Sequence, residues 1–301
     1  MRFVIWIATE QPWSDVVSTA RHADATGWDG IYFADHFMPS DEPPPPTPRL
    51  EAWTALSAVA AVTERARLGI LVSSNTFRHP AVLANMAGTT DVISGGRLVL
   101  GLGAGWQRSE HEAYGIELPE VPERLARLEE ACLVVRLLLT EERADFDGRY
   151  YVLRDAPCEP KGVQSRMPLL LGLSGERIGL SIAARHADIW NAWGSPELIA
   201  HKSEVLARHC EAAGRDPATI EHSAQVVLLM SDDRDQLARW AAEPPGMPHF
   251  SGSPGQVAEL FARYRDGGLD EFVVSDRWLG GSASERRECM ERLLEVASPF
   301  R

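Results

Sequence analysis

The sequence has only four cysteines and no apolar run long enough to cross a membrane. No stretch of about 18 uninterrupted apolar residues occurs, so we expect no segment to span a bilayer. The N-terminus lacks the basic stretch, long apolar segment and cleavage site of a secretory signal, which predicts a cytoplasmic protein. The cysteines form no CxxC pair, which indicates neither a zinc site nor a disulfide framework. They are Cys132, Cys158, Cys210 and Cys289.

Several catalytic signatures are also missing. There is no GxxxxGK[ST] phosphate loop, no GxSxG nucleophile elbow and no HxH or HExxH pair. These absences disfavour nucleotide hydrolysis, acyl transfer and metal hydrolysis, and we expect no metal site. Basic residues are outnumbered, 30 against 43 acidic ones, and the net charge of −13 argues against a general affinity for nucleic acid or anionic membranes.

The chain alternates short apolar runs of strand type with longer segments of helical period. This alternation predicts βαβ units and a parallel sheet. The eight expected strands lie at residues 3–7, 30–34, 66–72, 98–102, 169–172, 188–192, around 224–229 and 271–274. Eight such steps predict an α/β chain with a closed (β/α)8 TIM barrel, with insertions after the strands, since a doubly wound sheet usually stops near about six strands. We expect a single domain over residues 1–301.

Three segments between these units have a composition of their own. Residues 145–153, around Asp147-Gly148, have the pattern of a β-hairpin inserted before the fifth strand. The run Pro43 to Pro46 cannot join a helix or a sheet interior, so we expect an extended, stiff excursion, either a rim segment or a plain surface loop. Residues 244–253, rich in proline and glycine, predict another loop.

In a barrel, functional side chains follow the strands, and two titratable residues follow the second one. His36 can exchange a proton near neutral pH, and Asp35 could fix its tautomer or hold a second group. A simple cap for the following loop explains the pair equally well. Cys132, in contrast, lies in an apolar helical stretch and is expected to fill the core.

Glycines dominate the ends of the fourth and fifth strands. Gly101, Gly103 and Gly105 leave backbone without side chains where a flat ring could lie, although tight packing explains them too. Ser174-Gly175 precedes a helix, whose free N–H groups would suit a phosphate. A serine N-cap explains Ser174 as well.

Beyond single motifs, a series of segments resembles one known family in order and spacing. The segments are Gly27 to Gly30, Ala34 to Phe37, Arg67 to Gly69, Asn75 to Pro80, Asp91 to Arg97 (DVISGGR), Gly101 to Trp106 (GLGAGW), Phe146 to Tyr151 (FDGRYY) and Ala187 to Asn191. Together they cover roughly residues 1 to 275. The chain resembles the luciferase-like monooxygenases (bacterial luciferase superfamily), and within them the branch that uses the deazaflavin coenzyme F420.

The resemblance implies a barrel with an insertion near strands three to five, a homodimer, and a cofactor ring held at the barrel mouth. It also implies a non-proline cis peptide at Leu71-Val72, behind the ring. Asp35 and His36 would flank the reactive edge of the ring as the catalytic pair. The implied cofactor-binding residues are Asp35, His36, Leu71, Val72, Ser74, Asn75, Gly103, Ala104, Gly105 and Trp106, with Gly172, Ser174, Gly175 and Glu176 at the phosphate end.

One position departs from the resemblance. The sugar-phosphate dehydrogenases of the family carry an acidic glutamate where Trp106 stands here, and an indole instead favours an apolar or aromatic substrate. The deazaflavin carries a phosphate and an anionic glutamate tail, so basic side chains near the mouth would help to bind it. The candidates are Arg49, Arg78, Lys161 and Arg177, each of which is equally well explained as surface charge.

Three functional hypotheses follow. The first is an oxidoreductase that passes a hydride between F420 and a small organic molecule, with His36 exchanging the proton. The second is a monooxygenase that uses reduced flavin mononucleotide (FMN) and oxygen, with a separate reductase supplying the flavin. The third is a barrel that binds a flavin without turnover.

Overall fold

Eight parallel strands close into a barrel in the computed structural model, which describes residues 1–40 and 47–301. The ring closes because β3 pairs with both β2 and β5. In ring order the strands are β1 (Arg2–Ile7), β2 (Gly30–Phe33), β3 (Arg67–Ile70) with its continuation β4 (Ser73–Ser74), β5 (Leu98–Gly103), β8 (Leu169–Gly172), β9 (Ile189–Trp193), β10 (Glu221–Gln225) and β13 (Glu271–Ser275). The predicted (β/α)8 fold is confirmed. The run Pro43 to Pro46 lies outside the described residues.

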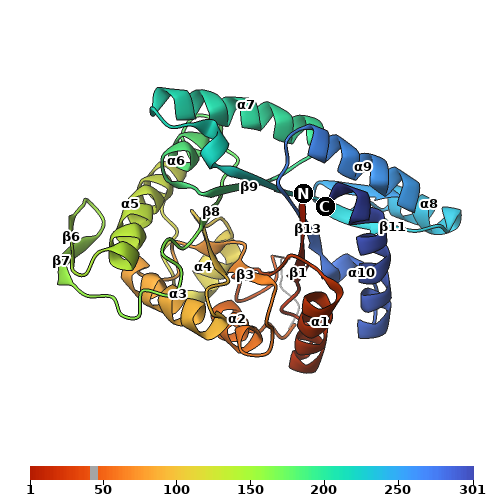
Figure 1. Ribbon diagram of the computed structural model, residues 1–301, viewed down its shortest axis with the longest axis horizontal. Coiled ribbons are helices and arrows are strands. Elements are labelled where there is room, and N and C mark those ends of the chain that lie inside the picture. Colours follow the sequence, from red (N-terminus) through yellow and green to blue (C-terminus); the bar gives the residue numbers. More distant parts are fainter. Residues whose placement is uncertain (41–46) are drawn as a thin grey trace.

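Helices surround the barrel (Figure 1). One follows each strand of the ring: α1 (Trp13–Thr26), α2 (Ala52–Ala60), α3 (Pro80–Ser94), α5 (Val121–Thr140), α6 (Gly179–His186), α7 (Pro196–Ala212), α9 (Pro254–Asp266) and α10 (Ala283–Ala297). Their apolar faces and the outward side chains of the strands form one large buried cluster, which includes Cys132. Burial raises the pKa of that thiol to about 12, so Cys132 fills the core as expected.

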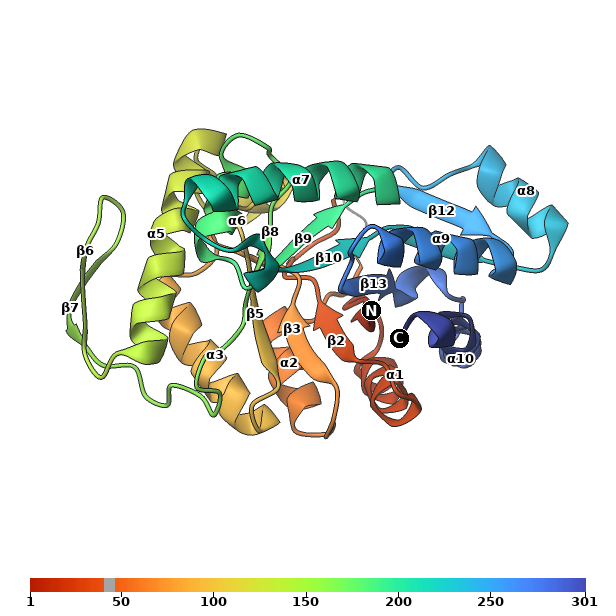
Figure 2. The same ribbon diagram turned by 45° about the horizontal axis from the view of Figure 1, so that its top comes forward.

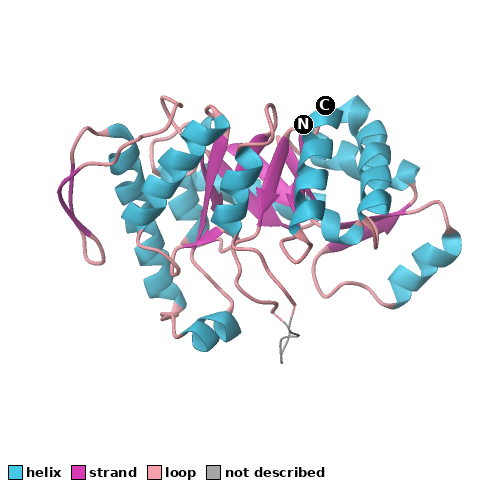
Figure 3. Ribbon diagram, turned by 90° about the horizontal axis from the view of Figure 1, so that it is seen from below, coloured by secondary structure: helices cyan, strands magenta, loops and turns pink. Residues whose placement is uncertain are grey.

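A second, smaller cluster fills the inside of the barrel. It consists of Val4, Tyr32, Leu71, Val99, Leu170, Ile189 and Val273, with Trp6 and Val72 packed against it. Because side chains alternate along a strand, residues two positions further toward the carboxyl end also face inward. Those inward positions line the barrel mouth, at the end opposite to the termini. Met1 and Phe300 meet at the other end, where the N-terminal ammonium donates to the Phe300 carbonyl at 2.9 Å (Figure 3).

Two insertions extend from the barrel in opposite directions (Figures 1 and 2). The predicted hairpin is confirmed as β6 (Ala144–Asp147) and β7 (Val152–Ala156), which follows α5. The other insertion contains β11 (Val227–Met230), α8 (Arg234–Ala242) and β12 (His249–Gly252). A seven-residue helix, α4 (Arg108–Tyr114), lies between β5 and α5, and three short 3-10 helices are η1 (Pro217–Thr219), η2 (Asp276–Trp278) and η3 (Ser298–Phe300).

The structure corrects three predicted boundaries. The apolar run at 224–229 is two strands, because the chain leaves the barrel at Val226 and continues as β11, which pairs in parallel with β12. The predicted loop at 244–253 is therefore wrong over His249–Gly252. The third expected strand is interrupted after Ile70, where the Leu71-Val72 peptide is cis, and resumes as β4. No helix among the described residues is long and apolar enough to cross a membrane.

Candidate active site

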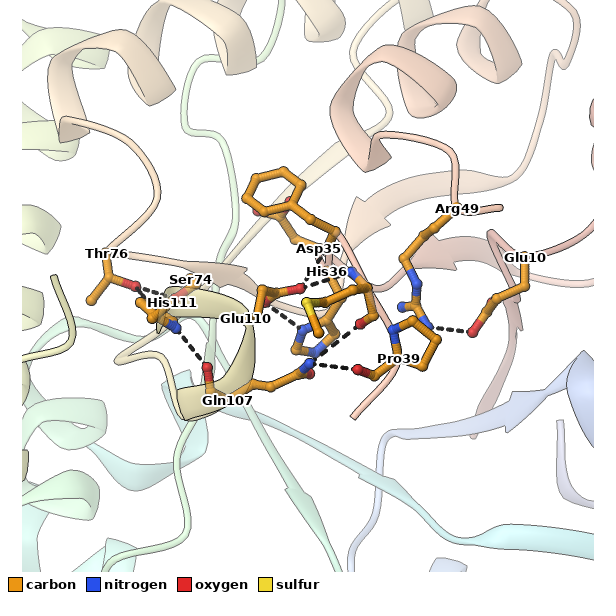
Figure 4. A network of polar contacts seen from close by, with 12 residues as sticks. Glu10, Asp35, His36, Pro39, Arg49, Ser74, Thr76, Gln107, Glu110 and His111 are labelled. Atoms are coloured by element: carbon orange, nitrogen blue, oxygen red, sulfur yellow. Dashed lines mark hydrogen bonds and ion pairs between the residues drawn. The ribbon is translucent and has the colours of Figure 1, made fainter. Parts of the chain in front are cut away.

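The side chain of His36 at the barrel mouth is oriented by a carboxylate that the sequence analysis missed. Glu110 of α4 is fully buried, and its Oε1 lies 3.2 Å from Nδ1 of His36 (Figure 4). Its second oxygen accepts the backbone N–H groups of Phe37 and Met38. Burial raises the pKa of Glu110, but the hydrogen bonds from His36 and the backbone outweigh it and hold the pKa below its ordinary value. Glu110 is therefore an anion at neutral pH.

An ionised carboxylate fixes the tautomer of the histidine. Because the Glu110 anion only accepts hydrogen bonds, Nδ1 of His36 carries a hydrogen and Nε2 is left to exchange a proton at the mouth. The indole of Trp106 packs edge-to-face on the imidazole, with ring centroids 5.5 Å apart, and is itself 64% exposed. His36 is thus oriented on one side and in contact with an accessible apolar surface on the other.

Asp35 does not fix the tautomer of His36, because its carboxylate is bound to Arg78. The Nη1–Oδ2 contact is short, and Nη2 of Arg78 lies 3.0 Å from Oδ1 and 2.7 Å from Glu51. Burial raises the pKa of Asp35, although the ion pair with Arg78 opposes that shift. Glu51 also accepts the first N–H groups of α2 from Trp53 and Thr54. Of the two alternatives for Asp35, the structure shows that it holds a second group.

The cis peptide implied by the resemblance is present at Leu71-Val72. Val72 lies beside the glycines of β5 and β8: a methyl group on Gly103 would lie 2.6 Å from Cγ2 of Val72, and one on Gly172 would lie 3.1 Å from the same side chain. Close packing against Val72 therefore explains these two glycines. A planar ligand at this side of the mouth would rest against Val72.

Ser74 is the end of a hydrogen-bond chain with a defined direction (Figure 4). Nδ1 of His111 lies 2.7 Å from the Gln107 carbonyl, which can only accept, so Nδ1 carries the hydrogen. In a neutral ring Nε2 then accepts from Thr76, at 2.6 Å, and Thr76 in turn accepts from Ser74, also at 2.6 Å. The Ser74 hydroxyl hydrogen is used inside this chain. Its oxygen can therefore only accept a hydrogen bond from a ligand.

Asn75 follows Ser74 but faces the inserted hairpin. Its backbone N–H donates to the Gly103 carbonyl at 2.9 Å, and its Nδ2 donates to the Tyr151 hydroxyl at 3.1 Å. On the other side of Gly103, the Gly105 carbonyl accepts from Arg124, and Ala104 packs against the outer core. Asn75 and Ala104 thus contact the protein on the outer side of the mouth, although Oδ1 of Asn75 is buried without a partner in the described part of the chain.

The predicted phosphate end begins at Gly172, the last residue of β8, continues through buried Leu173, and forms an exposed loop from Ser174 to Glu176 before α6. Lys202 of α7 binds this loop: its Nζ lies 2.7 Å from the Ser174 carbonyl and 3.3 Å from Glu176. The hydrogen bond from Lys202 lowers the pKa of Glu176. The side chain of Glu176 is thus paired with a cation, whereas the backbone N–H groups of the loop, Lys202 and the exposed Arg177 are suited to an anion.

The four basic candidates have separate surroundings. Arg49 pairs with Glu10 at 2.5 Å, and Arg78 pairs with Asp35 and Glu51. Lys161 donates to the Cys158 carbonyl and pairs with Glu159, in the segment after the hairpin. Arg177 alone lies on the predicted phosphate loop, where it is exposed.

Sequence reasoning missed the residues that hold His36 and Ser74 in place. Glu110 and His111 lie 74 and 35 residues from the partners they bind, so no local spacing links them. The sequence did contain a weak signal for a functional role, since Glu110 and His111 lie in the segment that follows the glycine-rich end of β5. Lys202, inside the helical pattern of α7, gave no signal.

Comparisons with known proteins agree with this architecture. The family model for luciferase-like monooxygenases matches residues 1–251. The chain is 38% identical over 230 residues to an F420-dependent glucose-6-phosphate dehydrogenase of Intrasporangium calvum, and 31% identical over 223 residues to one of Amycolatopsis mediterranei. Each match covers 73% of this chain and 66% of the relative, so the chain spans slightly less than two thirds of the length of these curated relatives.

Solved structures share the fold at low sequence identity. An F420-dependent secondary alcohol dehydrogenase in complex with an F420-acetone adduct superposes with a TM-score of 0.84 at 20% identity, covering 100% of both chains. The F420-dependent tetrahydromethanopterin reductase of Methanopyrus kandleri gives 0.83 at 18% identity, covering 100% of this chain and 99% of the other. A long-chain alkane monooxygenase gives 0.82 at 15% identity, covering 100% and 92%. At these identities the likeness concerns the fold alone.

Proposed function

The chain belongs to the luciferase-like monooxygenase family, and on that premise we propose that it is an oxidoreductase that transfers a hydride between coenzyme F420 and an uncharged organic substrate. The observation that carries this proposal is the His36–Glu110 pair beside the exposed indole of Trp106. It combines a proton-exchanging group of fixed orientation with an apolar surface, at the end of the barrel where such enzymes act.

The residues at the mouth fit a deazaflavin with a phosphate tail. Val72 offers a wall for a planar ring, and Ser74 offers an oxygen that accepts a hydrogen bond from a ring N–H. The loop from Ser174 to Arg177 and the ammonium of Lys202 suit an anion. When bound, F420 supplies the ring carbon that gives or takes the hydride.

The protein contributes position and a proton. His36 holds or takes the proton that accompanies hydride transfer to or from a carbon–oxygen bond, through Nε2. Glu110 stabilises the imidazolium that forms when His36 takes a proton. Trp106 covers the imidazole and excludes water from one side of it.

The charge distribution supports an uncharged substrate. The chain has only two lysines, Lys161 and Lys202, and neither is free at the substrate side of the mouth. Arg49 and Arg78 are both paired with carboxylates there. A sugar phosphate of the kind that the named relatives use would have to compete with these carboxylates or bind Arg124, which already donates to the Gly105 carbonyl. We therefore propose that the substrate differs from theirs.

The homodimer expected from the resemblance is part of the proposal. Val82 and Ile93 on α3 and Leu133 on α5 are 40–54% exposed, and α3 packs on α5, so an apolar surface is available on this side of the barrel. Arginine at position 93 in place of isoleucine (Ile93→Arg) should convert a dimer into a monomer in size-exclusion chromatography with light scattering.

The cofactor is tested by binding. Isothermal titration of the purified chain with F420 and with FMN should give micromolar or tighter binding of F420 and at least about tenfold weaker binding of FMN. Lys202→Met should weaken F420 binding by about tenfold, because the loop loses one of two cations and the anion of Glu176 loses its lysine partner. Tight binding of FMN with none of F420 would instead favour a monooxygenase that uses reduced FMN.

The role of His36 is tested by its replacement. His36→Ala should lower kcat by a factor of about 100 to 10,000 and change the dissociation constant of F420 by less than about threefold. The assay follows F420 absorbance with the fastest substrate from a panel of uncharged alcohols and ketones. His249→Ala, at an exposed position of β12, serves as the control. Equal rates for His36→Ala and the control would exclude His36 as the proton donor.

A further inference from the structure

Two tryptophans and a glutamine form one face of the barrel mouth. Trp6 is two residues beyond Val4 of the inner cluster, and Trp6 packs against that cluster. Gln225 is paired in register with Val273, also of the inner cluster, and with Trp193. Paired residues of parallel strands point to the same side, so all three side chains face the inside of the barrel. The rings of Trp6 and Trp193 meet edge-to-face at 5.9 Å, and we refer to Trp6, Trp193 and Gln225 as the aromatic wall.

The aromatic wall lies across the barrel from the proposed cofactor side. In ring order the strands are β1, β2, β3, β5, β8, β9, β10 and β13, so each strand faces the one four places further on. Gln225 on β10 therefore faces the Leu71-Val72 segment that follows β3. Trp6 on β1 faces Gly172 on β8. A molecule held between the two sides would have the cofactor ring on one side and the aromatic wall on the other.

Two polar atoms of the wall are buried without a partner. Gln225 is only 4% exposed, and no group in residues 1–40 or 47–301 reaches its Oε1. The indole Nε1 of Trp6 is likewise buried and unpaired within the described part of the chain. Buried polar groups in folded proteins are usually hydrogen-bonded, since desolvation without a partner is costly. The wall thus presents one unused acceptor and one unused donor to a neutral ligand.

Charged groups around the wall have their own partners. Asp276, at the end of β13, accepts from the Ala8 N–H at 2.8 Å and from Gln11 at 2.7 Å. Glu10 is held by Arg49 and, at 3.4 Å, by Arg277. These contacts leave the wall itself neutral. A neutral surface of two indoles suits a planar apolar body better than an ion.

We propose that the aromatic wall is the substrate subsite, and that it selects an uncharged molecule with an aromatic body and a neutral oxygen function that Gln225 and the Trp6 indole bind. This inference deepens the proposed function and rests on it for the position of the cofactor. Gln225 acts here as a specificity-determining residue. The carboxamide can accept from a hydroxyl or donate to a carbonyl, so it serves both an alcohol and the corresponding ketone.

Binding of matched small molecules tests the proposal. The probes are acetophenone, 1-phenylethanol, ethylbenzene, which lacks the oxygen, and the anion 4-acetylbenzoate, each titrated into the full chain with and without F420. Acetophenone and 1-phenylethanol should bind saturably below about 10 mM. Ethylbenzene and 4-acetylbenzoate should bind at least about tenfold more weakly.

Substitutions in the wall should change this selectivity. Gln225→Leu should weaken acetophenone binding about tenfold and leave ethylbenzene unchanged or tighter, because only the first ligand loses a hydrogen bond. Trp193→Leu should weaken both ligands by a similar factor. The controls are Gln236→Leu on α8 and Trp13→Leu at the start of α1, where the indole is 41% exposed. Circular dichroism confirms that each variant is folded.

The outcomes separate this proposal from the proposed function. If F420 does not bind but the wall variants change acetophenone binding as expected, the cofactor assignment fails and the subsite stands. If F420 binds and acetophenone does not bind saturably, or binds equally to the chain and to Gln225→Leu, the subsite proposal is wrong. Tighter binding of 4-acetylbenzoate than of acetophenone would also overturn it, because the subsite would then prefer an anion.

Discussion

The two sides of the barrel mouth differ in how completely their polar side chains are bonded. After β2 and β5, the side chains of Asp35, Glu110 and His111 each make two or more hydrogen bonds or ion pairs, although Oδ1 of Asn75, after β4, is buried without a partner among the described residues. We call this side the bonded rim. Across the mouth, Gln225 and the Trp6 indole of the aromatic wall leave buried polar atoms unpaired among the described residues. The bonded rim is therefore set before a ligand arrives, whereas the wall gains hydrogen bonds only on binding.

Arg78→Met would break the bonded rim most severely. The substitution leaves the buried carboxylate of Asp35 without its cation, which should lower the free energy of unfolding by about 3–5 kcal/mol. Chemical denaturation at neutral pH measures this change. The double variant Asp35→Asn, Arg78→Met should regain part of the loss, since no buried charge remains. A loss below about 1 kcal/mol would show that solvent reaches Asp35 and that this part of the rim is loosely packed.

Asp276→Asn tests the wall side, where one carboxylate is buried. Burial raises the pKa of Asp276 from 3.8 to about 6, although hydrogen bonds from Gln11 and Ala8 oppose the shift. A raised pKa in the folded state means that this group stabilises the fold fully below about pH 4, and that the contribution is lost as the pH rises through about 6. Relative to the asparagine variant, the unmodified chain should lose stability on the order of 3 kcal/mol between those limits.

Denaturation midpoints at several pH values measure the effect. The control is Asp266→Asn, at an exposed position at the end of α9. Parallel pH profiles for the unmodified chain and Asp276→Asn would show that Asp276 keeps its ordinary titration and that the wall side is better solvated than its burial indicates.

Glu110→Gln gives the smallest expected effect and sharpens the comparison, because it keeps the shape of the rim and removes one charge. The glutamine oxygen can still accept from Nδ1 of His36, while its amide nitrogen faces the backbone N–H groups of Phe37 and Met38 and cannot accept from them. We therefore expect about a tenfold loss of kcat and a lower melting temperature. The dissociation constant of F420 should change by less than about threefold, because Glu110 contacts His36 and the loop after β2. A lower melting temperature with an unchanged kcat would mean that Glu110 only supports the loop after β2.

The barrel was predictable from the sequence because each strand is a separate apolar run between helical segments. Prediction failed where the apolar run at 224–229 continues through Val226 and nothing in its composition marks the departure from the barrel. The resemblance to the family predicted the cis peptide at Leu71-Val72. The local sequence around these two residues gave no indication of it. Glu110 was missed because seven-residue α4 is too short for a periodic signal and because its partner lies 74 residues away.

Several motifs that carry the resemblance support the fold and lie outside the mouth. Asp91 of DVISGGR accepts from the backbone of Val163 and Gln164, which ties α3 to the segment before β8. Arg97 donates to the carbonyls of Ala60, Thr63 and Ala66. Such motifs identify the architecture well, because a buried polar side chain must match its partners. They say little about the substrate, because they lie outside the mouth.

Helix α4 contributes Gln107 at its start, Glu110 and His111, and so holds the loops after β2 and β4 at once. The proposed acid–base residue His36 and the proposed cofactor contact Ser74 therefore both depend on α4, so a substitution in this helix should affect both. The aromatic wall is built on other strands and has no share in this dependence. Directed evolution for new substrates can therefore draw its libraries from Trp6, Trp193 and Gln225, while the segment from Gln107 to Tyr114 is best exchanged as a block or left alone.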